Sequence, residues 1–230
     1  MIITNIGKQY EACPESMRTT PTAAIIILGH SNAGKSPLAA LLERNASRDH
    51  HRCLHLDFGE HLRLALNGRA DADLTPDEID YIASVMNGRL LDDAHFRIAE
   101  KIIRNFLSRN QFMPDEDTLV LNGIPRHIGQ ARDLHAIGIE VNTVIFLSCT
   151  LSVALARKQL ADKGIGHEDR SGRTDGSREI FERKIRSFEQ ETLPLVDYYR
   201  SKGVRVVTID VTADMTPETM YDFCVEAGAI

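Results

Sequence analysis

The sequence predicts an α/β protein in which helices cover both faces of a five-stranded parallel sheet. Three observations lead to this class. Short apolar runs alternate with amphipathic stretches, the runs are apolar throughout rather than at every second position, and the first run leads directly into a glycine-containing loop that opens a helix. Strands buried on both faces have such continuous runs, and parallel strands need crossover connections that are usually helical.

The apolar runs set the expected strands, and the helical spacing of apolar residues sets the expected helices. The strands are expected at 23–28, 52–56, 118–121, 143–147 and 204–209, of which 52–56 is the weakest. The helices are expected at 35–47, 58–67, 76–87, 92–109, 128–137, 151–162, 177–200 and 215–227. Three of these helices separate the second strand from the third, which is more than one crossover needs. We therefore predict a helical insertion over one edge of the sheet.

The length of 230 residues fits one large domain with insertions, at roughly 150 residues per domain. Residues 1–20 match no periodicity, and we interpret residues 1–22 as an N-terminal extension, so that the domain is 23–230. The helical insertion is assigned to 57–90. A glycine-rich stretch follows the helix at 151–162, and a short lid is assigned to 158–176.

Composition excludes several classes of protein. The 27 basic and 33 acidic residues give a formal charge of −6, whereas a nucleic-acid-binding protein usually has a basic excess. No apolar stretch is long enough for a transmembrane helix, and the N-terminus does not read as a signal peptide. The four cysteines form no CxxC pair, which favours a reducing, cytoplasmic location over a disulfide framework or a zinc site.

One motif carries specific chemistry. The segment after the first strand fits GxxxxGK[ST], the phosphate-binding P-loop, with the residues Gly29, His30, Ser31, Asn32, Ala33, Gly34, Lys35 and Ser36. The glycines let the backbone wrap around an anion, and the N–H groups at the start of the helix point at the phosphates. Lys35 is expected to reach the β- and γ-phosphates of ATP, and the Ser36 hydroxyl to bind Mg²⁺.

Later segments resemble the nucleoside monophosphate kinases, and adenylate kinase most closely. The segment HLDFGEHLR at 55–63 is similar to the family's H-[IL]-S-T-G-D-L-L-R, and LNGIPRHIGQ at 121–130 to L-D-G-F-P-R-x-x-x-Q. GRTDG at 172–176 and TLPLVDYY at 192–199 are similar to G-R-x-D-D and T-x-P-L-I-x-Y-Y. Each match is weak alone, but they occur in family order and with nearly family spacing. The resemblance implies a three-layer α/β/α P-loop NTPase fold with a helical NMP-binding insertion and a short lid.

The resemblance also implies roles for individual residues. Arg63 and Arg126 would bind the phosphate of the acceptor monophosphate, for which forked guanidiniums are suited. Gln130 would hydrogen-bond the acceptor base, and Arg157 would lie against the donor nucleotide. Lys35, Arg126, Arg173 and Lys184 would surround the phosphoryl group in transfer. The acceptor site would comprise Phe58, Gly59, Arg63, Gly123, Arg126 and Gln130.

Two departures from the family pattern bear on the metal and on the base. Asn122 stands where the family has an aspartate that holds the water shell of Mg²⁺, so this chain keeps an acceptor oxygen there but loses the charge. Asp57, at the end of the second strand, could supply a carboxylate or could simply cap the next helix. Phe58 replaces a threonine of the monophosphate pocket, which puts the base preference in doubt.

The implied activity is transfer of the γ-phosphoryl group of Mg·ATP to a nucleoside monophosphate, with AMP the best single acceptor. The partners are ATP and a nucleoside monophosphate, with Mg²⁺ as the cofactor, and the protein is expected to be a monomer that binds neither nucleic acid nor membrane. Two alternatives stay open. One is a small-molecule kinase with a different acceptor, which Phe58 favours, and the other is a nucleotide-binding regulatory protein with little turnover, which Asn122 favours.

Overall fold

In a computed structural model the structure describes residues 20–46, 52–69, 72–86, 89–163 and 178–230. Five parallel strands form one sheet in the order β2-β3-β1-β4-β5. The strands are β1 (Thr22–Gly29), β2 (Arg52–Asp57), β3 (Asp117–Asn122), β4 (Ile139–Ser148) and β5 (Arg205–Asp210). The predicted five-stranded parallel sheet is therefore confirmed, and it includes the weak strand β2.

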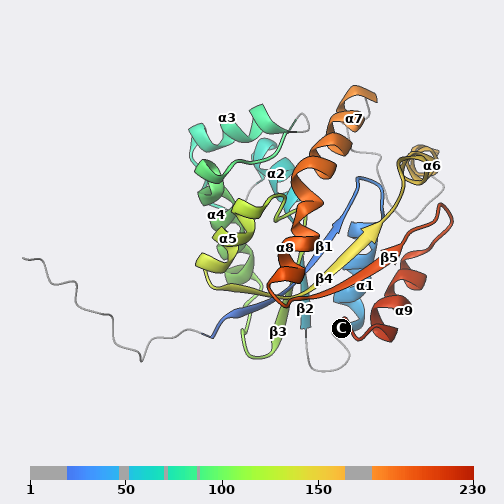
Figure 1. The fold of residues 1–230 in the computed structure, drawn as a ribbon. Helices are drawn as coiled ribbons and strands as arrows, with labels where there is room; N and C mark the ends of the chain where they lie inside the picture. Colours follow the sequence, from blue (N-terminus) through green and yellow to red (C-terminus); the bar gives the residue numbers. More distant parts are fainter. Residues whose placement is uncertain (1–19, 47–51, 70–71, 87–88, 164–177) are drawn as a thin grey trace, which may run out of the picture.

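Helices cover both faces of the sheet and make three layers, as the sequence predicts (Figure 1). The helices before the fourth strand are α1 (Lys35–Ala46), α2 (Phe58–Leu66), α3 (Pro76–Val85), α4 (Phe96–Arg109) and α5 (Ile128–Ala136). Those after it are α6 (Leu151–Asp162), α7 (Arg178–Ser187), α8 (Pro194–Ser201) and α9 (Pro217–Glu226). A 3₁₀ turn at Asp93–His95 precedes α4.

The two faces of the central strand enter two separate cores. Ala24, Ile26 and Leu28 of β1 pack in the core that contains residues of α2, α4, α5 and α8. Ile25 and Ile27 pack in the core that contains residues of α1 and α9. Successive side chains of a strand point to opposite faces, so both sets are buried and the whole run must be apolar.

The longest predicted helix, 177–200, is interrupted in the structure. Phe188–Thr192 forms a π-helical turn between α7 and α8, and the N–H of Leu193 donates to the carbonyl of Phe188 over 2.8 Å. Pro194 has no N–H to continue the α-helical ladder and its ring crowds the preceding turn. A wider turn directly before the proline accommodates it, which the apolar spacing alone does not reveal.

Strand β4 begins four residues earlier than predicted. The prediction missed its first half because that half is covered on one face only. Glu140 and Asn142 are exposed there, whereas Thr143, Val144 and Ile145 are buried. The alternation of exposed and more buried positions breaks the continuous apolar run from which the strand was predicted. None of the described helices has the length and apolar character to cross a membrane.

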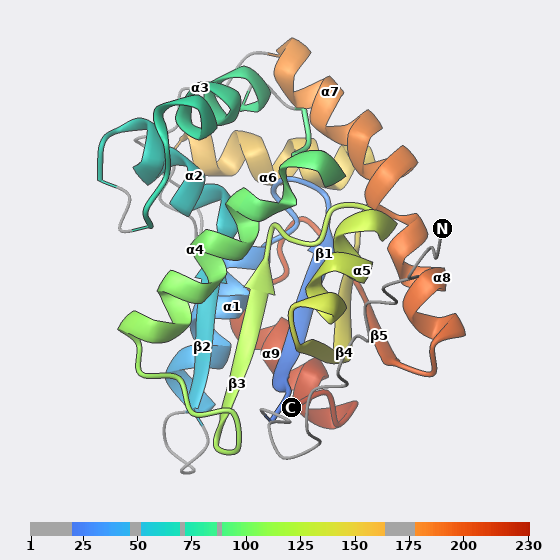
Figure 2. The same cartoon turned by 90° about the vertical axis from the view of Figure 1, so that its left-hand side faces the viewer.

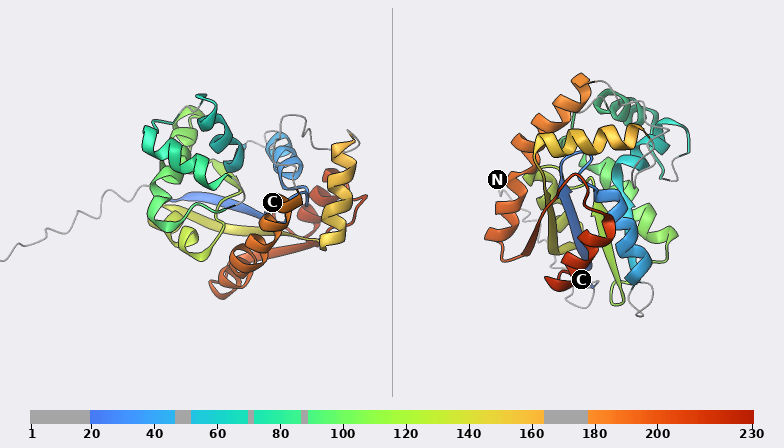
Figure 3. Two further views of the ribbon diagram at one scale, coloured as in Figure 1. Left: turned by 90° about the horizontal axis from the view of Figure 1, so that it is seen from above. Right: turned by 90° about the vertical axis from the view of Figure 1, so that its right-hand side faces the viewer.

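Several helices surround the carboxyl ends of the strands. Figure 2 shows the strands running upward, with α2, α3, α6 and α7 gathered above their ends. Seen from above in Figure 3, α2 and α3 lie at one end of this face and α6 at the other. The predicted lid, 158–176, begins inside α6, and the part of it from residue 164, with Arg173, lies outside the described residues.

Candidate active site

The phosphate loop connects β1 to α1 and is shaped by its backbone. Gly29 has φ +155°, and a Cβ built on it would lie 2.9 Å from the carbonyl oxygen of Leu147 on the neighbouring strand, so only glycine fits. Gly34 has φ +100°. The Nζ of Lys35 donates to the carbonyls of Gly29 at 2.9 Å and His30 at 2.7 Å. The lysine therefore closes the loop on itself and stands at its centre.

Arg157 of α6 lies against the same loop. Its Nε donates to the carbonyl of Asn32 at 3.0 Å, and its Nη1 donates to the carbonyls of Thr212 at 3.0 Å and Met215 at 2.8 Å. A Cβ on Gly34 would lie 3.0 Å from its Nη2. The guanidinium thus joins the phosphate loop to the segment after β5, on the side where a donor nucleotide is expected.

His30 belongs to the loop, and its side chain is buried against the π turn instead of being exposed to solvent. Its ring centroid lies 4.2 Å from that of Phe188 in the π turn, and the residue is 8% exposed. Burial lowers the pKa of His30, although Glu189 acts in the opposite direction. The imidazole is therefore neutral near pH 7 and links the loop to the π turn.

Three polar side chains meet where the loop faces the ends of β2 and β3. The Ser36 hydroxyl donates to Oδ2 of Asp57 at 2.8 Å, and Nδ2 of Asn122 lies 2.9 Å from Oγ of Ser36 and 3.0 Å from the same Oδ2. Parallel pairing sets Asp57 directly opposite Asn122. Burial alone would raise the pKa of Asp57, but hydrogen bonds from Ser36 and from the N–H of Glu60 hold that pKa below its usual range. The carboxylate therefore stays ionised.

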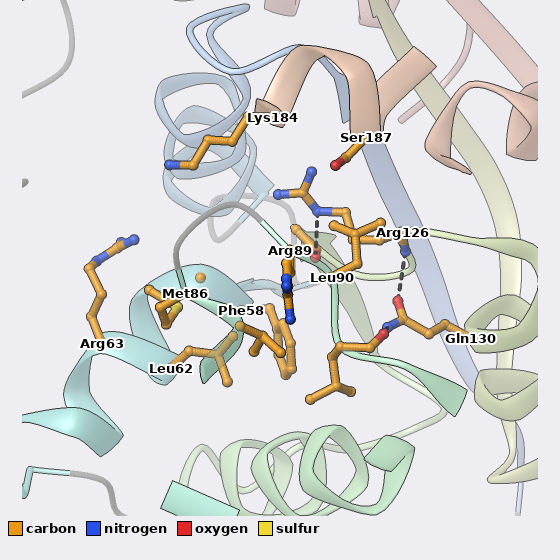
Figure 4. A pocket seen from close by; sticks show the side chains of 14 residues that line it. Phe58, Leu62, Arg63, Met86, Arg89, Leu90, Arg126, Gln130, Lys184 and Ser187 are labelled. Carbon is orange, nitrogen blue, oxygen red and sulfur yellow. Dashed lines mark hydrogen bonds between the residues drawn. The ribbon is translucent and has the colours of Figure 1, made fainter. Parts of the chain in front are cut away.

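A cavity of about 120 Å³ lies beside this cluster. It is lined by every residue predicted for the acceptor site, together with the predicted Lys184: Phe58, Gly59, Arg63, Gly123, Arg126, Gln130 and Lys184. Figure 4 shows the larger side chains of this set around the cavity, with Phe58 and Arg63 on α2, Arg126 in the loop between β3 and α5, Gln130 on α5, and Lys184 on α7. Residues that are far apart in the sequence, from Phe58 to Lys184, thus line one cavity, as the resemblance implies.

Arg126 is the charge at the centre of this cavity. Its Nε donates to the carbonyl of Gly123 at 3.1 Å, and no carboxylate pairs with it among the residues that the structure describes. Burial lowers the pKa of Arg126, while the charge of Asp57 raises it. A guanidinium pKa is far above neutrality, so the group stays charged even so. A half-buried charge that no carboxylate in the described part of the chain pairs with favours an anion as its partner.

Gln130 lines the cavity, but its amide already has backbone partners. The Oε1 accepts from the N–H of Arg126 at 2.7 Å and the Nε2 donates to the carbonyl of Leu91 at 2.8 Å, and the residue is 1% exposed. To read a base with both ends of this amide, a ligand would have to exchange these bonds. The predicted contact with the acceptor base therefore stays a prediction.

The sequence reasoning missed one cation of this cavity. Arg89 lies in the segment between α3 and α4 and lines the pocket beside Leu90, and Figure 4 shows its side chain near Phe58. Val85 at the end of α3, together with Met86 and Leu91 of this segment, adds apolar walls. The segment has no clear periodicity, so the only signal was an arginine at the end of the predicted insertion.

Comparisons with known proteins agree with this geometry. No protein-family model matches the chain. Adenylate kinase of Mesoplasma florum is 27% identical over 222 residues, which cover 86% of this chain and 96% of that protein. Uridylate kinase of Saccharomyces cerevisiae is 24% identical over 200 residues, or 86% and 87% of the two chains. The chain is similar to nucleoside monophosphate kinases along most of its length, and to several adenylate kinases among them.

Other relatives match this kinase-like chain over a shorter region. Adenylate kinase isoenzyme 5 of Bos taurus is 31% identical over 110 residues, which are 48% of this chain. The matched region is only 18% of the isoenzyme 5 proteins of cattle and humans. The resemblance that the motifs suggested is confirmed by the relatives matched along most of the chain. The comparisons do not address the roles of individual site residues.

Proposed function

We propose that this protein is an ATP-dependent nucleoside monophosphate kinase, a phosphotransferase that moves the γ-phosphoryl group of ATP to a nucleoside monophosphate. The observation that carries the proposal is the pair of anion-binding features at one edge of the sheet. The phosphate loop and the cavity around Arg126 are bridged by Asp57, which hydrogen-bonds Ser36 of the loop and is close enough to influence the pKa of Arg126. A donor phosphate and an acceptor phosphate could therefore meet between them.

The chemistry suits the residues present. The attacking oxygen belongs to an acceptor phosphate that is already ionised, so no general base is required. Catalysis then consists of positioning the two phosphates and neutralising charge in the transition state. Lys35 and Arg126 have this role, joined by Lys184 and, from outside the described residues, Arg173. Exclusion of water by the insertion at 57–90 and the lid at 158–176 would prevent hydrolysis of ATP.

Mg²⁺ belongs to this proposal because the donor set fits it. A hydroxyl, a carboxylate and an amide meet at the end of the phosphate loop, and Mg²⁺ prefers oxygen ligands while keeping several of its waters. Ser36 would bind the ion directly and Asn122 through water. When bound, the ion neutralises the charge of the β- and γ-phosphates. Among the described residues no three His, Cys, Asp or Glu side chains cluster to suggest another metal centre.

AMP is the acceptor that we propose first. We also propose that the protein is a cytoplasmic monomer that binds neither nucleic acid nor membrane. The engaged amide of Gln130 and the burial of Phe58, which is 4% exposed, favour one alternative. If neither residue contacts a base, the acceptor is a different phosphorylated or hydroxylated small molecule, and the enzyme is a small-molecule kinase on the same scaffold.

A coupled assay of ADP release with AMP, GMP, CMP, UMP and dTMP tests the proposal. Turnover that depends on one monophosphate, and that Lys35→Met abolishes, supports it. Turnover with none of the five, in a protein that binds ATP, contradicts it and favours either another acceptor or a regulatory protein. A co-crystal structure with a dinucleoside polyphosphate, which occupies both base sites, would then identify the residues that contact each base.

A further inference from the structure

The carboxylate next to Ser36 of the phosphate loop comes from β2, although the family resemblance predicts one on β3. The family resemblance assigns the carboxylate of the Mg²⁺ shell to position 122, at the end of β3, where this chain has asparagine. The neighbouring strand β2 ends in Asp57, and the pairing of the two strands sets these two positions side by side. The site therefore has one carboxylate at the carboxyl end of the sheet, as the resemblance predicts, but on the neighbouring strand.

The hydrogen bonds of Ser36 show how this carboxylate acts on the expected metal ligand. The single hydroxyl hydrogen of Ser36 is donated to Oδ2 of Asp57. One lone pair of its Oγ accepts from Nδ2 of Asn122 at 2.9 Å. One lone pair is left, and a hydroxyl whose hydrogen is held by a carboxylate is a more basic ligand with a fixed orientation.

Asn122 in turn is a donor to this cluster. Its Nδ2 carries two hydrogens and lies within hydrogen-bond distance of both Ser36 and Asp57. The reverse orientation would bring the amide oxygen against a carboxylate oxygen, which no hydrogen atom could bridge. The expectation that Asn122 turns its acceptor oxygen toward the site is therefore replaced by a donor role that holds the Asp57 carboxylate in place.

Capping of α2 does not by itself account for an aspartate here. The Oδ1 of Asp57 accepts from the N–H of Glu60 at 3.0 Å and caps the helix. Asparagine caps a helix about as well as aspartate. The other oxygen, Oδ2, is directed at Ser36 and Asn122, so the charge serves the phosphate loop rather than the helix.

We propose that Asp57 supplies the anionic group of the Mg²⁺ site, in place of a carboxylate at position 122. It would orient the Ser36 hydroxyl and accept hydrogen bonds from water on the ion, while Asn122 restrains it. The inference rests on the proposed function, because it assumes that the loop binds Mg·ATP.

The test is the affinity for ATP measured by calorimetry with MgCl₂ and with EDTA, since the ratio of the two affinities reports metal binding without turnover. The variants are Asp57→Asn, the exchange Asp57→Asn/Asn122→Asp, and the control Asp210→Asn. Asp210 ends β5 at the same edge of the sheet, but it is exposed and lies on the far strand. Melting temperatures check that each variant folds.

We expect Asp57→Asn to reduce the Mg²⁺ enhancement of ATP affinity by about tenfold or more, the usual effect of losing a partner of a metal ligand. The affinity measured in EDTA should not fall. The exchange should recover most of the loss because it returns one carboxylate to the pair, and Asp210→Asn should match the wild type. Binding of Mn²⁺ in the presence of ATP, followed by electron paramagnetic resonance, should rank the variants in the same order.

The outcomes separate this inference from the proposed function. A wild type that binds no ATP would overturn both. A wild type that binds ATP, with an Mg²⁺ enhancement that Asp57→Asn leaves unchanged, would overturn only the inference. The inference would also be overturned if Asp57→Asn lost the Mg²⁺ enhancement and a folded exchange variant did not recover it. A carboxylate at position 122 could then not replace the one at position 57.

Discussion

The phosphate loop and the cavity around Arg126 are built in different ways. The loop is one stretch of eight residues whose shape comes from backbone conformation, with Gly29 and Gly34 at positive φ and Lys35 bonded to loop carbonyls. The cavity instead is lined by residues of α2, the end of α3, the segment before α4, the loop after β3, α5 and α7. The loop is therefore preorganised by local sequence, whereas the cavity depends on how separate helices pack. Changes on the two sides should have separable kinetic effects.

The largest effect is expected from Lys35→Met, which breaks the donor side. The side chain keeps its length but loses the charge that faces the β- and γ-phosphates, and we expect kcat to fall about 10³-fold, as for removal of a central charge donor in a transition state. The coupled ADP-release assay at saturating substrates measures it. Near-normal turnover in this variant would mean that the loop is not the phosphate site.

Arg126→Lys should come next, and it should reduce use of the monophosphate without weakening the binding of ATP. Lysine retains the charge but not the fork that fits a phosphate, so we expect kcat/KM for the monophosphate to fall about 10²-fold. The affinity for ATP measured by calorimetry should stay within twofold of the wild type. An equal loss of ATP affinity would show that the two sides are not separable.

The same comparison explains what could be read from the sequence. The phosphate loop is contiguous, so its pattern alone located all eight residues, which run from the last residue of β1 to the second residue of α1. The strands β1 and β3 and the second half of β4 were predicted because burial on both faces demands apolar runs. The edge strands β2 and β5 are less buried, and they were predicted from the apolar residues that they keep. The cavity was found only through the resemblance, because Arg63 and Arg126 lie on elements whose packing no local pattern specifies.

Residues without a local pattern were missed or misjudged for physical reasons. Arg89 sits in a segment without periodicity, and its position depends on how α3 and α4 pack. The hydrogen bonds of Asp57 to Ser36 and Asn122 depend on β2 pairing with β3, which the chain order alone does not determine. The π turn links both sides, since Phe188 contacts His30 and the hydroxyl of Thr192 donates to the carbonyl of Arg126 at 2.8 Å.

Arg89→Gln should sharpen the comparison with a smaller effect. The side chain is exposed at the rim of the cavity, where a charge contact contributes about 1 kcal/mol or less, so we expect KM for the monophosphate to rise about fivefold with kcat nearly unchanged. Arg132→Gln is the matched control, since Arg132 is exposed on α5. A change in kcat rather than KM would assign Arg89 to the transferring phosphate instead.

The smallest kinetic effect is expected at the opposite edge of the sheet, where Asp117→Asn should alter stability and leave turnover intact. The Asp117 carboxylate is 3% exposed and accepts from Nε of Arg52 at 2.8 Å, from a second guanidinium nitrogen, and from the N–H of Met113 at 2.8 Å. Burial alone would raise the pKa of Asp117, but the bonds from Arg52 and Met113 hold it below its usual range.

A carboxyl group whose pKa is lower in the folded state contributes stability above its unfolded pKa, near 4, and loses it as the pH falls through the folded value. Asp117→Asn should therefore lower the free energy of unfolding by about 2 kcal/mol at pH 7, and the difference from the wild type should shrink below about pH 4. Urea denaturation from pH 7 to pH 3 measures this. A constant difference across that range would mean that the ionised carboxylate is not the source of the stability. Unchanged kcat and KM at pH 7 would show that the active edge of the sheet is independent of the edge where β2 and β3 begin.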